Sequence, residues 1–307
     1  MNMNNKNWVS VWGNAVSIAE HHPEAYAKYI TLRYPVYIPF AGDTLRFTFD
    51  NFCGSEAVTV TRATVSAATS PVYEKMPLAC PCKKETICDI TFSKNESVTM
   101  EAHQTAVSDP VSFPVKKGMT LTVSLYFADF TLMQSAVLVT GPLSKGFFSL
   151  GDQTHADALP MDTTKTTNWF YFLSNIELMT AEENHTVICY GDSITAGAWP
   201  DYLTLLARQN PDNHTAFIRR ATSGSRVLRQ YECITYDSYG LKGTNRFPHE
   251  IPTTGADTVI IQQGINDIIH PVGIETNPFR PMSDLPTVKE LIDGYRYYIE
   301  EAKKLHL

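Results

Sequence analysis

The chain lacks any apolar run of the roughly 18 residues that a membrane span needs. Its start, MNMNNKNWVSVWGNAVSIAE, also lacks the basic segment and apolar core of a secretory signal. Positive charge is scarce, because 25 Lys and Arg stand against 32 Asp and Glu and give a net charge of −7. We therefore expect a cytoplasmic protein that has no membrane span and does not bind nucleic acid.

Cysteine is too sparse for a disulfide scaffold at this length, so the thiols are expected to stay reduced. Cys80, Cys82 and Cys88 cluster in the sequence and could hold zinc only with a fourth ligand such as Cys53. Their spacing is not that of a zinc knuckle. We expect free thiols in a loop, no metal and no cofactor. The six cysteines are Cys53, Cys80, Cys82, Cys88, Cys189 and Cys233.

Helical periodicity is almost absent between residues 30 and 148. Short extended segments such as TLRFTFDNF and MTLTVSLYFADF alternate apolar or aromatic residues with polar ones, and turn residues such as AGD and KKG separate them. This pattern is typical of an antiparallel β-sandwich. We expect it to occupy residues 1–180.

A different pattern follows over residues 181–307, with a boundary expected near residues 176–185. TVICYGDS is an apolar strand that meets a turn, and AWPDYLTLLARQN has helical spacing behind it. TAFIRRATSGS and DTVIIQQGIND repeat the strand-to-loop pattern, and LPTVKELIDGYRYYIEEAKKL has one apolar helical stripe. In DTVIIQ, residues 259–261 suit a strand covered on both faces. The alternation predicts an α/β domain with a parallel, doubly wound sheet.

Three loops follow these predicted strands, namely GDSITAG at 191–197, TSGS at 222–225 and GIND at 264–267. Loops at the carboxyl ends of parallel strands gather at one sheet edge, where ligands bind. Ser193 can present its hydroxyl on a tight turn, Gly224 can bring a backbone N–H against a substrate, and Asn266 can donate an amide N–H. Each also has an ordinary structural interpretation, as a helix cap or a turn.

Taken together, GDSIT after a strand, the glycine of ATSGSRVL and GIND after a third strand resemble the first three sequence blocks of SGNH/GDSL hydrolases. The N-terminal segments are similar to the β-sandwich of an esterase or lysophospholipase-like branch. No G-x-S-x-G elbow occurs, which disfavours an α/β-hydrolase. The resemblance implies a flavodoxin-like domain and a lipase-like enzyme that cleaves acetyl or short acyl esters of a saccharide or lipid-like small molecule.

Residue roles carry over from the same resemblance. Ser193 would be the nucleophile, and its own N–H, that of Gly224 and the amide of Asn266 would form the oxyanion hole. Gly191 and Asp192 would have structural roles in the nucleophile loop.

The family's Asp-x-x-His block has no match after residue 267, so the catalytic His and Asp stay unknown. Asp-x-x-His spacing occurs at Asp152 to His155, which precedes the nucleophile, and at Asp267 to His270, which begins within GIND; the other histidines weighed as bases are His249 and His306. We expect a domain truncated at its C-terminus, with an open apolar sheet edge through which the chain self-associates. The alternatives are a non-catalytic carbohydrate-binding or scaffold module and an inactive fragment.

Overall fold

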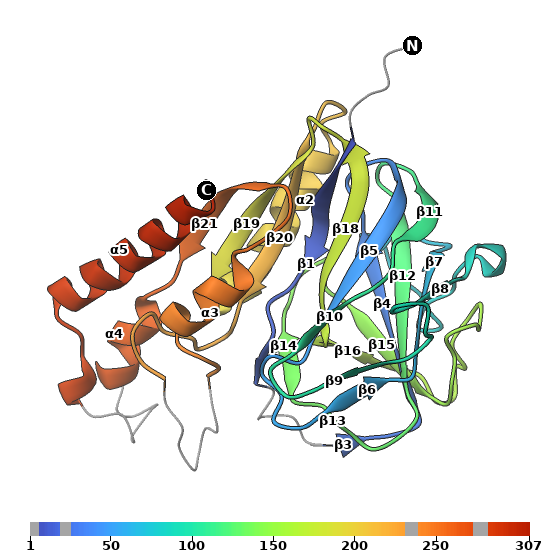
Figure 1. Cartoon of the computed structure of the whole chain (residues 1–307), viewed down its shortest axis with the longest axis horizontal. Helices are drawn as coiled ribbons and strands as arrows, with labels where there is room; N and C mark the ends of the chain where they lie inside the picture. The colour runs from blue at the N-terminus through green and yellow to red at the C-terminus, as the bar shows by residue number, and fades with distance from the viewer. Residues whose placement is uncertain (1–5, 19–25, 231–238, 273–281) are drawn as a thin grey trace.

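The computed structural model describes residues 6–18, 26–230, 239–272 and 282–307. Strands dominate it, with the antiparallel sheets on one side of Figure 1 and most of the helices on the other. One antiparallel sheet has the order β1 (Lys6–Gly13), β18 (Leu173–Ala181), β5 (Gly42–Asp50) and β10 (Thr105–Val107), with β11 (Val111–Val115) also on β5. The other runs β16 (Lys165–Thr167), β15 (Gly146–Leu150), β4 (Ile30–Tyr37), β12 (Thr120–Phe127), β7 (Arg62–Ala67) and β8 (Cys88–Ile90).

Smaller antiparallel sheets accompany this sandwich. They are β13 (Thr131–Leu132) with β3 (Tyr26–Ala27), β17 (Trp169–Tyr171) with β14 (Ser135–Leu138) and β2 (Ser17–Ile18), and β6 (Val58–Val60) with β9 (Val98–Met100). The helices are α1 (Ser193–Ala196), α2 (Trp199–Arg208), α3 (Gly243–Glu250), α4 (Ile265–Val272) and α5 (Val288–Lys304), with short 3-10 turns at Lys84–Thr86 and Met282–Asp284.

The core of the sandwich follows from strand alternation. In β5, Leu45, Phe47 and Phe49 are fully buried, while the residues between them face outward in part. They belong to the same apolar cluster as residues of β4 and β12 in the opposite sheet. Side chains that alternate with a period of two therefore fill the space between the sheets. The predicted antiparallel strands before residue 180 do form.

The predicted α/β fold class is wrong. Most strands are antiparallel, and among the described residues parallel pairing joins only three strands, in the order β20 (Thr215–Ala221), β19 (His185–Gly191) and β21 (Ala256–Gln262). The three strands lie where the sequence predicted them. Local alternation of strand and helix does not determine how many strands join a sheet, so neither the doubly wound sheet that it predicted nor the flavodoxin-like domain that the resemblance implied forms in the described residues.

Two further expectations fail beside this sheet. No residue of β21 is fully buried, and Ile260 is 40% exposed, so β21 is a partly exposed edge rather than a strand covered on both faces. The apolar stripe predicted for α5 faces outward at Val288, Ile292 and Ile299, and the helix buries Tyr298 instead. Self-association through the exposed edge stays a prediction.

The parallel sheet packs against the sandwich without a break in the core. Ala216 and Ala221 of β20 belong to the largest apolar cluster together with sandwich residues. Their small side chains allow a close approach. Ser10 of β1 donates its N–H to the carbonyl of Thr254 and accepts the hydroxyl of Thr186 on its own carbonyl. The division into domains at residues 180 and 181 stays a prediction.

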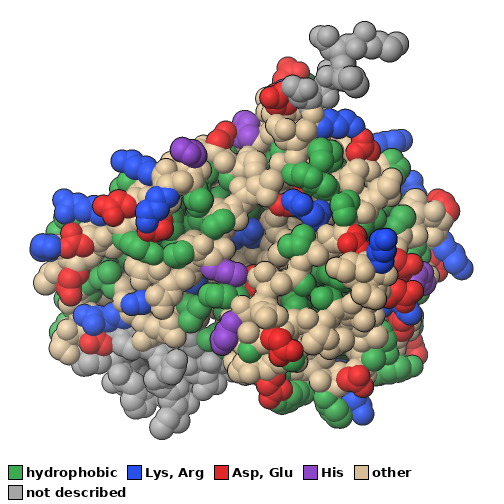
Figure 2. Space-filling model, in the orientation of Figure 1, with side chains coloured by type: hydrophobic (Ala, Val, Ile, Leu, Met, Phe, Trp, Pro, Cys, Tyr) green, Lys and Arg blue, Asp and Glu red, His purple; other side chains and the backbone are tan. Residues whose placement is uncertain are grey.

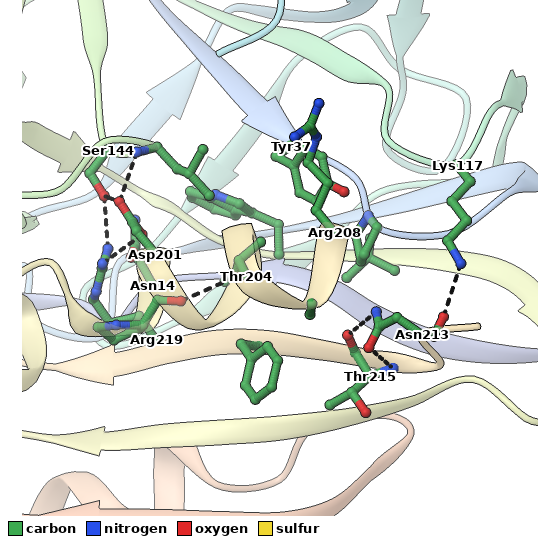
Figure 3. A pocket seen from close by; sticks show the side chains of 18 of the residues that line it. Asn14, Tyr37, Lys117, Ser144, Asp201, Thr204, Arg208, Asn213, Thr215 and Arg219 are labelled. Carbon is green, nitrogen blue, oxygen red and sulfur yellow. Dashed lines mark hydrogen bonds and ion pairs between the residues drawn. The ribbon is translucent and has the colours of Figure 1, made fainter. Parts of the chain in front are cut away.

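Two adjacent arginines of β20 bind the two regions from opposite faces of the sheet. Arg219 forms a buried ion pair of 2.7 Å with Asp201 of α2 and donates to the hydroxyl of Ser144 at 2.9 Å (Figure 3). Arg220 donates to the backbone carbonyls of Asn14 at 2.7 Å and Ser174 at 2.8 Å. Successive side chains of a strand point to opposite faces, so one dipeptide supplies both attachments.

Charge elsewhere is dispersed. Figure 2 shows Lys and Arg side chains interspersed with Asp and Glu over the visible face. Among the described residues, no helix is long and apolar enough to cross a membrane.

Replacing Asp201 by alanine is expected to lower the free energy of unfolding by about 3 kcal/mol or more, because it leaves the buried Arg219 guanidinium without its counter-charge. Urea denaturation monitored by tryptophan fluorescence measures the change. Asp293→Ala, which breaks an exposed ion pair with Lys289 on α5, is the matched control and should leave the midpoint unchanged. Equal effects from the two substitutions would contradict this account.

Candidate active site

Ser193 lies where β19 ends and α1 begins. Asp192 is the N-cap residue of α1, and its buried carboxylate accepts the backbone N–H of Ile194 at 3.0 Å. Burial raises the pKa of Asp192, although the hydrogen bond from Ile194 opposes that shift. The Asp192 side chain therefore caps α1, and Ser193 beside it is exposed.

Gly191 allows the strand ends to meet. A Cβ at this position would collide with the carbonyl oxygen of Gln262 and the hydroxyl of Thr195. The N–H of Asp192 bonds the same Gln262 carbonyl at 3.3 Å, and the N–H of Thr222 bonds the carbonyl of Gly191 at 3.1 Å. These contacts bring the ends of all three parallel strands together.

The loop at 222–225 and the segment at 264–267 are joined through Ser225. The Ser225 hydroxyl accepts from Gln263 at 2.7 Å and Arg246 at 3.1 Å, and its carbonyl accepts from the Asn266 side chain at 3.1 Å. Gly224 has a φ of +75°, and a Cβ there would collide with the ring of Tyr239. The structure therefore brings Gly224 and Asn266 into neighbouring positions, as the spacing of the motifs predicts.

GIND is not a free loop, since residues 265–267 form the first turn of α4. The Asp267 carboxylate accepts the N–H groups of Val227 at 2.8 Å and Leu228 at 3.0 Å. Burial raises the pKa of Asp267, and the two N–H groups oppose the shift. Asp267 thus holds the segment after Gly224 against α4.

Three hydrogen-bond donors lie in these segments without a partner among the described residues. They are the backbone N–H groups of Ser193 and Gly224 and one of the two amide hydrogens of Asn266. The hydroxyl of Ser193 likewise makes no hydrogen bond within the described ranges, to Gly224, to Asn266 or to any other residue.

The histidines weighed as bases bond elsewhere. His155 pairs with Asp89 at 3.0 Å, while Asp152 binds Arg62, so Asp152 and His155 do not form a hydrogen-bonded dyad. His249 bonds Asp50 of the sandwich at 2.8 Å and stacks on Phe52, with ring centroids 3.8 Å apart. His306 is exposed just beyond the C-terminal end of α5.

His270 is buried in α4, close to the site but turned toward Arg226. Its Nδ1 lies 2.6 Å from the Arg226 guanidinium, which can only donate, so Nδ1 accepts and Nε2 carries the hydrogen. The ring also packs on that of Tyr239, with centroids 5.0 Å apart. The Nδ1 atom of His270 therefore bonds Arg226 and not the Ser193 hydroxyl.

The thiols do not form a metal centre in the part of the chain that the structure describes. No three His, Cys, Asp or Glu side chains there are arranged to hold a metal ion. Cys80 and Cys82 are buried, and burial raises the pKa of Cys80 to about 12. Cys233 lies outside the described residues.

The sequence patterns missed the residues that support the site. Arg219 donates to the carbonyls of Thr195 at 3.2 Å and Gly197 at 3.1 Å, at the end of α1. Arg246 is buried and pairs with Glu250 at 3.0 Å. Burial opposes the charged form of Arg246, but the Glu250 carboxylate outweighs it and raises the pKa of Arg246. The only sequence signal was the pair of charged residues within the apolar strand AFIRRA.

Comparisons with known proteins indicate little more. No protein-family model matches the chain, and no curated protein matches it. Among solved structures it is similar to an active-site mutant of a family two carbohydrate esterase from Clostridium thermocellum, with 10% identity and a TM-score of 0.29, over 98% of this chain and 74% of that one. A TM-score this low carries no argument, so the function has to be inferred from the residues of the site.

The ion pair of His249 with Asp50 makes the stability of the fold depend on pH. Burial lowers the pKa of His249, but the hydrogen bond and charge of Asp50 outweigh it and raise the pKa above its ordinary value of about 6.5. The stabilisation is therefore complete below about pH 6.5 and is lost as the pH rises through the raised pKa.

We expect the difference in unfolding free energy between wild type and His249→Gln to be larger at pH 6 than at pH 9, as measured by urea denaturation. Asp50→Asn, which keeps the shape but removes the charge, should abolish the same pH dependence. A difference that stays constant with pH would show that His249 contributes only its stacking on Phe52.

Proposed function

We propose that the chain is a carboxylic ester hydrolase with the SGNH/GDSL arrangement of motifs and with Ser193 as its nucleophile. The observation that carries the proposal is the meeting of three strand ends beside an exposed serine. The N–H of Thr222 bonds the carbonyl of Gly191 there, and the N–H of Asp192 bonds the carbonyl of Gln262. Asn266 is tied to the same group through Ser225.

The unpaired donors fit an oxyanion hole. In ester cleavage the Ser193 oxygen attacks the carbonyl carbon and its proton passes to a base, so that negative charge develops on the carbonyl oxygen. The N–H groups of Ser193 and Gly224 and the remaining amide hydrogen of Asn266 would stabilise that charge. The ester C–O bond then breaks, the alcohol leaves with the proton, and water hydrolyses the acyl-serine to a carboxylic acid.

A short acyl group is the substrate that the surroundings of Gly224 favour. The ring of Tyr239 packs directly against the Cα of Gly224, and we expect it to limit the length of the acyl chain that lies beside the Gly224 N–H. We propose acetyl or another short acyl ester, with a saccharide or lipid-like alcohol. The reaction needs no metal in this scheme.

The test compares p-nitrophenyl acetate hydrolysis by wild type, Ser193→Ala and Ser223→Ala. Ser223 is an exposed serine on the adjacent loop and gives a matched control. Ser193→Ala should fall to the uncatalysed rate and Ser223→Ala should keep the wild-type rate. Because no described histidine bonds Ser193, added imidazole should increase the rate difference between wild type and Ser193→Ala.

Asn266→Ala should lower kcat by about 100-fold in the same assay, because it removes one oxyanion donor. Equal turnover by wild type and Ser193→Ala, with and without imidazole, would refute the proposal.

A further inference from the structure

The sandwich carries a cavity of about 780 Å³, and Ser193 is not among the residues that line it. Residues of β16, β15 and β4 line it, together with residues of the segments around β3 and β17. Figure 1 shows β3, β4, β15 and β16 in the antiparallel part of the molecule, away from α4 and α5. A volume of this size lies within the range of about 300 to 1,000 Å³ typical of small-molecule sites. No part of the proposed ester hydrolysis uses it.

The floor of this groove follows from strand register. Phe148 of β15 pairs with Leu32 of β4 on one side and with Lys165 of β16 on the other, so the three side chains form one row. Two residues along, Leu150 pairs with Ile30 on the same face. The floor is therefore apolar in its middle and ends in a cation at the β16 edge.

Aromatic side chains line the walls. Phe130 is 70% exposed and Tyr26 is 45% exposed, although both are large and apolar. Trp169 and Tyr171 of β17 also line the groove, with ring centroids 6.4 Å apart. Lys28 covers one face of the Phe130 ring, with its Nζ 4.5 Å from the centroid. Exposed aromatic side chains that gather at one cavity are typical of a binding site.

Polar side chains are as numerous as aromatic ones in the lining. Asp162, Thr163, Lys165 and Thr167 supply hydrogen-bond donors and acceptors along one rim. Thr163 already bonds the Ser149 hydroxyl, and Thr167 accepts the N–H of Trp169. A fatty acyl chain would, however, cover the exposed Asp162 and Lys165 side chains without replacing their hydrogen bonds to water, at a cost in desolvation. The carboxylate of Asp162 would repel a polyanion, and the ammonium groups of Lys28 and Lys165 would repel a polycation.

A neutral sugar chain fits this mixture. The C–H faces of pyranose rings pack on aromatic rings, and their hydroxyl groups both donate and accept hydrogen bonds. We propose that this groove is a binding site for a neutral oligosaccharide, separate from the ester-cleaving site. It goes beyond the proposed function, because it does not require Ser193.

The test is affinity gel electrophoresis of the Ser193→Ala chain in gels that contain xylan, mixed-linkage β-glucan, galactomannan or glycogen. At least one polysaccharide should retard the protein. Phe130→Ala and Tyr26→Ala should each weaken that binding by about tenfold, since each removes one stacking surface. Tyr202→Ala on α2, an aromatic residue 57% exposed outside the groove, is the control and should bind as the parent does.

Retardation that none of the groove variants weakens would overturn the proposal, as would the absence of retardation by all four polysaccharides. Urea denaturation of each variant verifies that it is folded. A fluorescent long-chain fatty acid is tested in parallel, and its binding in the groove without any polysaccharide binding would also overturn the proposal. Because every chain tested lacks the Ser193 hydroxyl, the result is independent of whether ester hydrolysis occurs.

Discussion

The buried ion pair between Arg219 and Asp201 is the interaction on which the rest of the site depends. Asp201 also accepts the backbone N–H of Leu143 at 2.9 Å and the hydroxyl of Ser144 at 3.0 Å, both from the sandwich. Arg219 also donates to the carbonyls at the end of α1. The sandwich, α2 and the helix that presents Ser193 therefore share one pair of buried charges. Burying charges is costly unless their hydrogen bonds are satisfied, and here several neighbours satisfy them.

Ser225 likewise joins several segments at the strand ends. Its hydroxyl accepts hydrogen bonds from Arg246 and Gln263, and its carbonyl accepts one from Asn266. Gln263 in turn accepts the hydroxyl of Tyr298, at 2.6 Å, in the small core between α3, α5 and the parallel sheet. The segments beside Ser193 are therefore held by a packed core. A site that must orient an ester carbonyl needs such support.

The sequence predicted individual elements well, because strand and helix periods are local properties. The β19, β20 and β21 strands, and the closeness of Gly224 to Asn266, follow from local patterns and from strand direction. The fold class could not be read in the same way, because the number of strands in a sheet depends on contacts between distant segments. For the same reason the partners of Arg219 were hidden, since Ser144 lies 75 positions away in the chain.

The exposure of a side chain could not be predicted where it depends on which other elements pack against its helix or strand. Val288 and Ile292 have the spacing of a buried helical face, yet Gly294 and Tyr298 make the inner contacts of α5. The groove of the sandwich also depends on contacts between segments that are distant in the sequence. Its row of Leu32, Phe148 and Lys165 exists only through pairing register across three strands, which no single segment encodes.

The central claim is that Ser193 is an activated nucleophile, and covalent labelling tests it most directly. The chain is incubated with a fluorophosphonate, with and without imidazole, and the modified peptide is identified by mass spectrometry. The account predicts one phosphonyl group, on Ser193, and none on the exposed Ser223 of the neighbouring loop. Labelling of both serines to the same extent, or of neither, would contradict it.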